Sequence, residues 1–239
     1  MIISPSAISP YKLPTFQSGG QAPFSFGNAL EFDGVNDFVT VPSIPISGEF
    51  TLNIWFNLNF TSKSSPMLFS NNAAAKYIRT VRTFGGGSAM YVLLGGSLNQ
   101  FTFPVWNDNT WYMFTLTRDA SNNLKAYINA VESTLTGVVD ANNTTFQLIG
   151  GYFTLAAFSF IDGKLDEIGF LSGTAATPTQ ISNLYKLGNG NDFNTVVGSS
   201  DVYYQFNQTS PDSTATDSSG NGNTGTLNNF DFATCWVAH

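Results

Sequence analysis

The chain has 239 residues, of which 42% are hydrophobic, 15% aromatic and 10% charged. This balance excludes a disordered chain and a coiled coil, which both need more charge. Nine Lys and Arg against sixteen Asp and Glu give a net charge of -7, which excludes nucleic acid and anionic lipid as partners because both require a basic surface.

The first 27 residues are predicted to form a Pro-rich, irregular arm. Pro5, Pro10, Pro14 and Pro23 remove backbone donors, and Gly19-Gly20 adds a flexible break. We expect the arm to dock on a neighbouring protein, with a loose terminus as the alternative. No basic and apolar leader is visible, and no apolar run approaches the roughly 18 residues of a membrane span, so we expect no membrane insertion.

Alternating hydrophobicity from Ala29 onward predicts strands. The clearest run is 50–60, where Phe, Leu and Ile alternate with Thr, Asn and Trp, so one face should be core. Gly and Asn clusters of the kind that form turns separate further runs. Strands are predicted at 37–41, 76–84, 89–94, 98–103, 111–117, 124–129, 146–150 and 164–171. So many short strands with almost no helix predict a sandwich or a barrel.

One short helix is predicted in the C-terminal half. Thr177 is its expected N-cap, Pro178 its first residue, Gln180 completes a capping box and Gly188 ends it. Residues 189–201 are polar and Gly-rich and are predicted to be a linker. Residues 202–239 are predicted to contribute a strand and a turn-rich segment.

Several motifs occur in an ordered set. They are 29–39, 50–56, 110–114, 124–129, 149–151 and 162–168. Together they resemble the laminin G-like domains of the concanavalin A-like lectin/glucanase superfamily, of the type found in bacteriophage structural proteins. The resemblance covers residues 28–188 and implies an all-β, antiparallel two-sheet jelly-roll sandwich with one short helix.

The C-terminal segment 202–239 is similar to a segment that stands before the Phe-Asp-Gly motif in this family, whereas here it follows the helix. The fold is then circularly permuted, with the segment closing the sandwich in cis or by exchange with a neighbouring subunit, or the segment is the stump of a second module. We favour closure, because the row Val202, Tyr204 and Phe206 would otherwise leave apolar side chains and a strand edge in water.

No catalytic residues are predicted. Cys235 is the single cysteine, which excludes an intrachain disulfide, and the single histidine is His239, too near the end to build a catalytic triad on a rigid element. Glucanases of the superfamily carry two glutamates and an aspartate on one strand face. Here the corresponding strand offers only Asp166-Glu167, whose side chains should point to opposite faces.

A structural calcium ion is one hypothesis for three aspartates. The resemblance implies a metal ligand at Asp166, which would otherwise be a costly carboxylate on an apolar face shared with Ile168 and Phe170. Asp33 and Asp37 flank a glycine turn and could add oxygen ligands of the kind Ca²⁺ prefers. The alternative is that all three accept hydrogen bonds from turn amides without a metal.

Glycan binding needs a solvent-facing aromatic ring flanked by amide or guanidinium donors. The candidates are Trp106 on a loop, and Tyr77, Arg79 and Arg82 on a strand with an open polar face. The alternative for each is a structural role. Trp55 is expected to pack under the helix or a loop.

The surface is rich in Asn, Ser, Thr and Gly and poor in Lys, which is typical of proteins that work outside cells. The first hypothesis is a non-catalytic virion surface protein, for capsid decoration, a head fibre or the tail, folded in the host cytoplasm. It would contact other virion proteins through its arm, bind host surface glycans and form a homo-oligomer. The alternative is an extracellular bacterial carbohydrate-binding module or adhesin, and a glycoside hydrolase is a third, less favoured reading.

Overall fold

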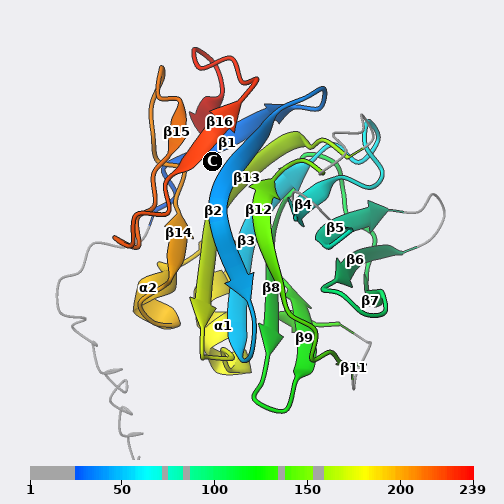
Figure 1. The fold of residues 1–239 in the computed structure, drawn as a ribbon. Helices are drawn as coiled ribbons and strands as arrows, with labels where there is room; N and C mark the ends of the chain where they lie inside the picture. The colour runs from blue at the N-terminus through cyan, green and yellow to red at the C-terminus, as the bar shows by residue number, and fades with distance from the viewer. Residues whose placement is uncertain (1–24, 72–74, 83–86, 134–137, 153–158) are drawn as a thin grey trace, which may run out of the picture.

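The computed structural model describes residues 25–71, 75–82, 87–133, 138–152 and 159–239, so the predicted arm falls outside the described residues up to residue 24. Two antiparallel sheets pack face to face (Figure 1), which confirms the predicted all-β sandwich. No helix among the described residues is long and apolar enough to cross a membrane.

In the first sheet, sheet A, seven strands pair one after another, β11 pairs in addition with β9, and β14 pairs in addition with β13. In spatial order its strands are β10 (Val131–Glu132), β9 (Asn123–Ile128), β8 (Trp111–Arg118), β3 (Phe50–Leu58), β13 (Asp162–Ser172), β1 (Asn28–Asp33) and β17 (Trp236–Ala238), with β11 (Val138–Val139) and β14 (Val202–Tyr204).

The second sheet, sheet B, faces the viewer in Figure 1. In spatial order its strands are β15 (Thr214–Ala215), β16 (Gly225–Asn228), β2 (Phe38–Ile46), β12 (Thr144–Ile149), β4 (Met67–Ser70), β5 (Tyr77–Arg82), β6 (Ser88–Leu93) and β7 (Asn99–Phe103). Residues 83–86, which include the end of the predicted strand 76–84, lie outside the described residues.

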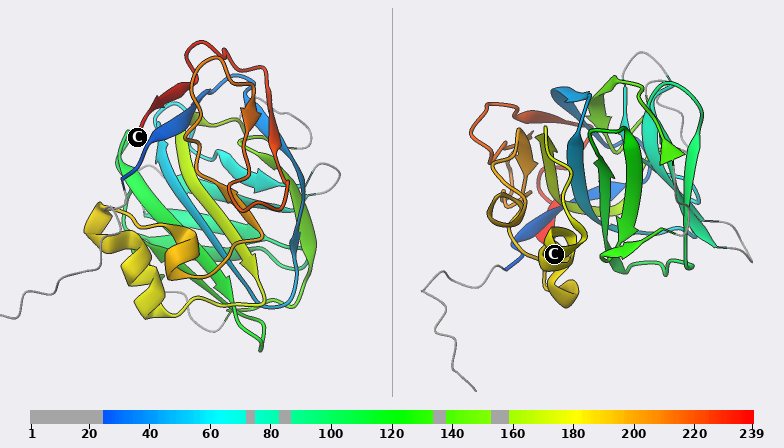
Figure 2. Two further views of the ribbon diagram at one scale, coloured as in Figure 1. Left: turned by 90° about the vertical axis from the view of Figure 1, so that its left-hand side faces the viewer. Right: turned by 90° about the horizontal axis from the view of Figure 1, so that it is seen from below.

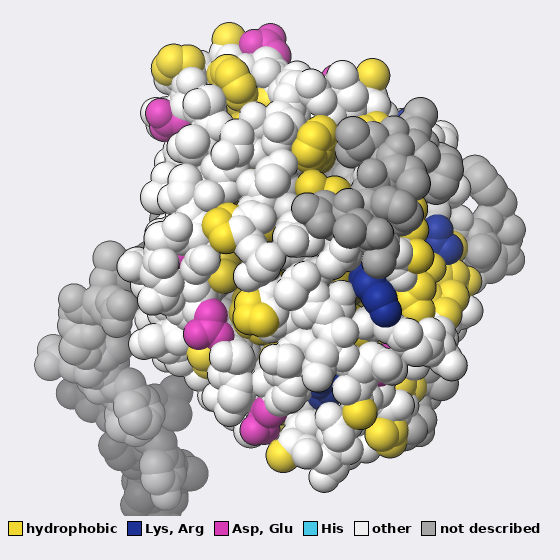
Figure 3. Space-filling view, viewed as in Figure 1, with side chains coloured by type: hydrophobic (Ala, Val, Ile, Leu, Met, Phe, Trp, Pro, Cys, Tyr) yellow, Lys and Arg dark blue, Asp and Glu magenta, His cyan; other side chains and the backbone are white. Residues whose placement is uncertain are grey.

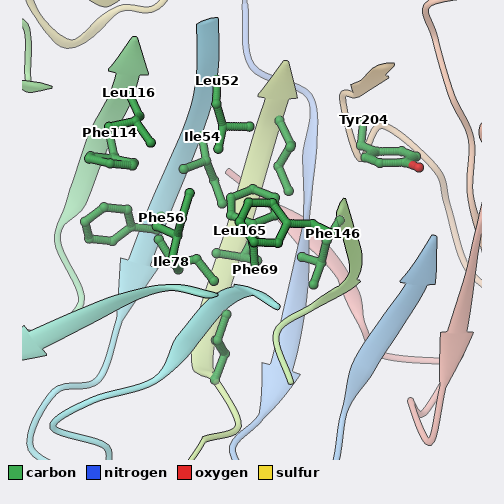
Figure 4. Close-up of a cluster of buried hydrophobic side chains, with 14 of the residues drawn as sticks. Leu52, Ile54, Phe56, Phe69, Ile78, Phe114, Leu116, Phe146, Leu165 and Tyr204 are labelled. Atoms are coloured by element: carbon green, nitrogen blue, oxygen red, sulfur yellow. The ribbon is translucent and has the colours of Figure 1, made fainter. Parts of the chain in front are cut away.

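The core lies between the sheets and is built from the alternate residues of each strand (Figure 4). In β3, Leu52, Ile54 and Phe56 point into it, as the alternation predicts. The opposite face of β3 is buried as well, because helix α1 (Pro178–Tyr185) covers it. Trp55 packs there with Ile181, and its ring centroid is 5.9 Å from that of Tyr185. This confirms the predicted position of Trp55 under the helix.

Helix α1 begins as predicted. Thr177 caps it, and the capping box with Gln180 is complete in both directions. The helix ends at Tyr185, and residues Lys186–Gly188 form a 3₁₀ turn. The predicted linker 189–201 contains a four-residue helix, α2 (Phe193–Val196), whose Phe193 packs in the layer under the helices, so this segment is more ordered than a linker. Figure 2 shows both helices on one side of the sandwich.

The C-terminal segment joins both sheets of the same chain. Strand β14 pairs with β13, and β17 pairs with β1, both in sheet A. Strand β16 pairs with β2 in sheet B. The apolar row Val202, Tyr204 and Phe206 is buried in the core of the same chain, so this segment is part of the sandwich.

Candidate functional site

The outer face of sheet B carries a cluster of aromatic rings around one arginine. Because Ile78, Met90 and Val92 point into the core, the alternate residues Tyr77, Arg79 and Tyr91 point outward. The ladder places Arg79 directly opposite Tyr91. We call Tyr77, Arg79, Tyr91 and Tyr152 the tyrosine–arginine platform.

The guanidinium of Arg79 contacts two rings of this platform. Its central carbon is 5.1 Å from the ring centroid of Tyr77 and 5.2 Å from that of Tyr91, which is cation–π distance. The ring of Tyr152 meets that of Tyr77 edge to face, with centroids 6.2 Å apart. Figure 3 shows Lys or Arg side chains beside hydrophobic ones in the region of β5 and β6.

The platform side chains are half-buried, and exposed Gln100 lies opposite Tyr91 on β7. A surface that combines aromatic faces, a guanidinium and an amide has the groups that orient a sugar ring. Tyr77 and Arg79 were predicted for this role. Tyr91 and Tyr152 were missed, because strand register and a distant loop bring them there.

The other two predicted glycan contacts occupy different places. Arg82 is on the core-side face of β5, where Nη1 lies 2.6 Å from Oδ1 of Asp108 and the guanidinium is over the ring of Phe60. Trp106 is 1% exposed and packs on Phe56 and Phe60, so the expected solvent-facing position is wrong. The backbone N–H of Trp106 donates to the buried Ser88 side chain, which holds this loop against the core.

An acidic pocket of about 360 Å³ lies at the end of β1. Its acidic lining consists of Glu31, Asp33, Asp37, Asp162 and Asp231. Asp33 and Asp162 stand directly opposite each other in the β1–β13 ladder, where like charges repel.

Asp37 is the buried member of this acidic pocket. It is 4% exposed; its Oδ2 accepts a hydrogen bond from the Asp33 backbone at 2.9 Å, and its Oδ1 has no partner among the described residues. Burial raises the pKa of Asp37 to about 6. Asp33 accepts hydrogen bonds from the Val35 and Asn36 amides, so it has the capping role of the alternative hypothesis.

The third predicted calcium ligand, Asp166, is not part of the acidic pocket. The β13–β3 ladder has a bulge after Asp166, because Asp166 is opposite Trp55 while Gly169 is opposite Asn53. Glu167 sits in this bulge with a φ of 49°. In the described part of the chain, no three His, Cys, Asp or Glu side chains form a group that could hold a metal ion.

The bulge also corrects the expected faces of β13. Leu165, Ile168 and Phe170 point into the core, so Asp166 does not share their face. Asp166 points to the side of sheet A that the helices cover, where the hydroxyl of Tyr203 donates a hydrogen bond to Glu167. The two carboxylates therefore lie on the same side of sheet A, whereas the alternation of a regular strand predicts opposite sides.

His239 is held firmly beside these carboxylates. Its Nδ1 is 2.6 Å from Oδ2 of Asp166, and its ring is stacked between those of Phe26 and Trp111, with centroid distances of 3.6 and 3.8 Å. The sequence predicts only that His239 is too near the end to build a triad on a rigid element, and nothing local indicates this packing.

Burial raises the pKa of both carboxyl groups well above the ordinary range. Burial, followed by the charge of Glu167, raises the pKa of Asp166 to about 9. Burial also raises the pKa of Glu167 to about 8. The two residues are 0% and 3% exposed, so both carboxyl groups lie beneath the surface of the described domain.

Residues 33–182 match a family model described as the concanavalin A-like lectin/glucanases superfamily, of laminin G type. Among curated proteins none matches the chain. Three of the many solved structures that match the chain have sequence identities of 12–19%, which establish the fold alone.

A Bacteroides ovatus protein, whose carbohydrate binding is itself a provisional assignment, aligns at 19% identity with a TM-score of 0.62 over 86% of this chain and 59% of its own. This chain therefore spans less than two thirds of that relative. The heptameric SAP-like pentraxin of Limulus polyphemus aligns at 12% identity and TM-score 0.55, over 67% of this chain and 82% of its own.

Domain 4 of AbnA, an extracellular GH43 arabinanase of Geobacillus stearothermophilus, was solved in complex with arabinotriose. It aligns at 19% identity and TM-score 0.52, over 70% of this chain and 82% of its own.

Proposed function

Because the chain belongs to the concanavalin A-like lectin/glucanase superfamily, we propose that it is a non-catalytic carbohydrate-binding module that holds glycans on the tyrosine–arginine platform. The observation that carries the proposal is the outward-facing arrangement of Tyr77 and Tyr91 around Arg79. A domain of this fold in complex with arabinotriose gives it further support. Absence of catalysis is inferred from the burial of Asp166 and Glu167.

Truncation of the platform tests this function. We expect Tyr77→Ala and Tyr91→Ala each to weaken binding to immobilised glycans about tenfold, which corresponds to about 1.4 kcal/mol of lost ring contact. Leu187→Ala is a suitable control, because Leu187 is 91% exposed and belongs to the α1 end of the molecule. Glycan binding that survives both tyrosine substitutions would place the sugar site elsewhere.

Our proposal for the setting of this module is the surface of a virion, with the arm 1–27 docking on other virion proteins and with several copies per assembly. The surface composition supports a protein that works outside cells. An extracellular bacterial module or adhesin is the second candidate, favoured by the same composition. Immunogold electron microscopy of purified particles, with antibody against this chain, separates the two settings.

We further propose that the acidic pocket holds a cation, loosely and partly through water. The support is the unpartnered buried Oδ1 of Asp37 and the opposed carboxylates of Asp33 and Asp162. Calcium accepts oxygen ligands in flexible geometry and keeps bound waters, which suits a pocket without a converged ligand set. Asp166 is left out of this site.

The melting temperature tests the cation. We expect 5 mM EDTA to lower Tm by about 2–4 °C relative to millimolar CaCl₂, which corresponds to about 1 kcal/mol for a domain of this size. Asp37→Asn should abolish the response, whereas Asp166→Asn should leave it intact because Asp166 lies outside the acidic pocket. Equal melting curves in EDTA and calcium would refute the cation.

A further inference from the structure

We propose that the tyrosine–arginine platform selects sugars that carry a carboxylate, with Arg79 as the group that binds it. This inference rests on the proposed glycan-binding function and specifies its ligand class. It follows from the contrast between Arg79 and the other well-placed cations of the chain.

The other two arginines and Lys125 have partners. Arg82 pairs with Asp108 at 2.6 Å, and Lys125 pairs with Glu132 at 3.2 Å. Arg118 is fully buried and donates to the backbone carbonyls of Gly48, Asp140 and Asn142 and to the side chain of Asn143.

Arg79 contacts aromatic rings instead of acceptors. Among the described residues no carboxylate pairs with it, and its Nε atom is buried without a hydrogen-bond partner. A half-buried guanidinium loses part of its hydration, and contact with the two rings compensates only partly for this loss. A buried N–H donor without an acceptor, such as Nε of Arg79, costs additional free energy. The chain has only nine Lys and Arg, and the position of Arg79 is that of a binding site for an anion from outside the chain.

The geometry fits a carboxylate on a sugar ring. A guanidinium presents its N–H donors as a planar fork, which matches the two oxygens of a carboxylate. Tyr77 and Tyr91 contact that fork, with ring centroids 5.1 and 5.2 Å from its central carbon. An acidic sugar whose carboxylate meets Arg79 can rest its apolar C–H face on a neighbouring tyrosine, while exposed Gln100 is available to its hydroxyls.

The overall charge limits the ligand to sparsely charged glycans. A net charge of -7 repels dense polyanions at long range, but this repulsion is screened beyond about 8 Å at physiological ionic strength. A sugar with a single carboxylate, bound by Arg79, is compatible with the screened repulsion from the net negative charge of the chain. The platform is therefore suited to uronate or sialate residues in a glycan rather than to nucleic acid.

An array of carboxylated oligosaccharides, each printed beside its own methyl ester, tests the inference with the full chain. We expect the acids to be retained and the esters to bind at least about tenfold more weakly, because esterification removes the charge and leaves the ring. Equal binding of acid and ester would overturn the carboxylate preference and leave the glycan-binding function standing. Binding to neither would overturn both.

Variants of Arg79 assign the effect. Arg79→Gln should reduce binding of the acids at least about tenfold and leave the esters unchanged, and Arg79→Lys should be intermediate because it keeps the charge without the fork. Lys125→Gln makes the same change in net charge on sheet A and serves as the matched control. A loss of acid binding that is equal in Lys125→Gln would refute a role for Arg79, and circular dichroism verifies the fold of each variant.

Discussion

Replacement of Arg118 by methionine is expected to lower the free energy of unfolding by about 3 kcal/mol or more. The side chain is 0% exposed, and its guanidinium holds four acceptors from the β2–β3 turn and the segment before β12. Methionine fills much of the space but leaves these acceptors without donors, and each unsatisfied buried acceptor costs about 1–3 kcal/mol before water enters.

This arginine connects the two sheets. It is the last residue of β8 in sheet A, and the segment it holds contains Asp140, whose Oδ2 accepts a hydrogen bond from Asn99 of β7 in sheet B at 2.8 Å. Burial lowers the pKa of Arg118, and the charge of Asp140 opposes this effect. The loss in Arg118→Met should therefore include the anchoring of β7, the neighbour of the strand that carries Tyr91.

Urea denaturation followed by tryptophan fluorescence measures this effect. Lys125→Met is the matched control, because Lys125 is exposed and its ion pair with Glu132 is at the surface, where a change within about 0.5 kcal/mol is expected. If Arg118→Met and Lys125→Met unfold at similar urea concentrations, the four acceptors are satisfied in another way in the variant.

Much of the fold follows from local alternation. The run at β3 is unambiguous because every second residue is large and apolar, and the N-terminus of α1 is identified by Thr177, Pro178 and Gln180. Strand β4 was missed because all four of its residues are buried, so that no polar residues alternate with the apolar ones. The C-terminal strands β15, β16 and β17 were missed because they are short and depend on pairing with strands that are distant in the sequence.

The sequence predicted only those residues of the candidate site that lie on a single strand. Tyr77 and Arg79 share a face of β5 by their spacing, whereas Tyr91 joins them through the β5–β6 register and Tyr152 through a loop. The bulge at Glu167 has no local signature, since a glutamate rarely adopts a positive φ. That single irregularity changes the face of Asp166, which lies outside the acidic pocket.

Asp166→Asn is expected to raise the free energy of unfolding at pH 8 by about 2 kcal/mol or more. The folded-state pKa of Asp166 is about 9, above the ordinary value of 3.8, so the unfolded chain releases this proton at lower pH than the folded chain does. The free energy of unfolding therefore decreases as the pH rises from about 4 to about 9. Asparagine has no proton to release and retains both hydrogen bonds, to the Glu167 amide and to His239.

The pH range from 7 to 9 separates this effect from the titration of His239. The pKa of His239 is lowered to about 4 by burial and then by the charge of Lys164, so this histidine is neutral in both states above pH 7. Glu167, with a pKa of about 8, remains in the variant, so we expect a shallower decline of stability with pH rather than none. The double variant with Glu167→Gln should be nearly flat.

Asp217 provides a control of opposite sign. Its carboxylate accepts hydrogen bonds from the amides of Tyr203, Ser219 and Asn223, and these bonds lower its pKa although burial opposes them. Its contribution is present above the unfolded-state pKa and is lost as the pH falls, so Asp217→Asn should destabilise the chain equally at pH 7 and pH 9. Parallel pH profiles for wild type and Asp166→Asn would mean that Asp166 is ionised in the folded chain, with His239 as its charged partner.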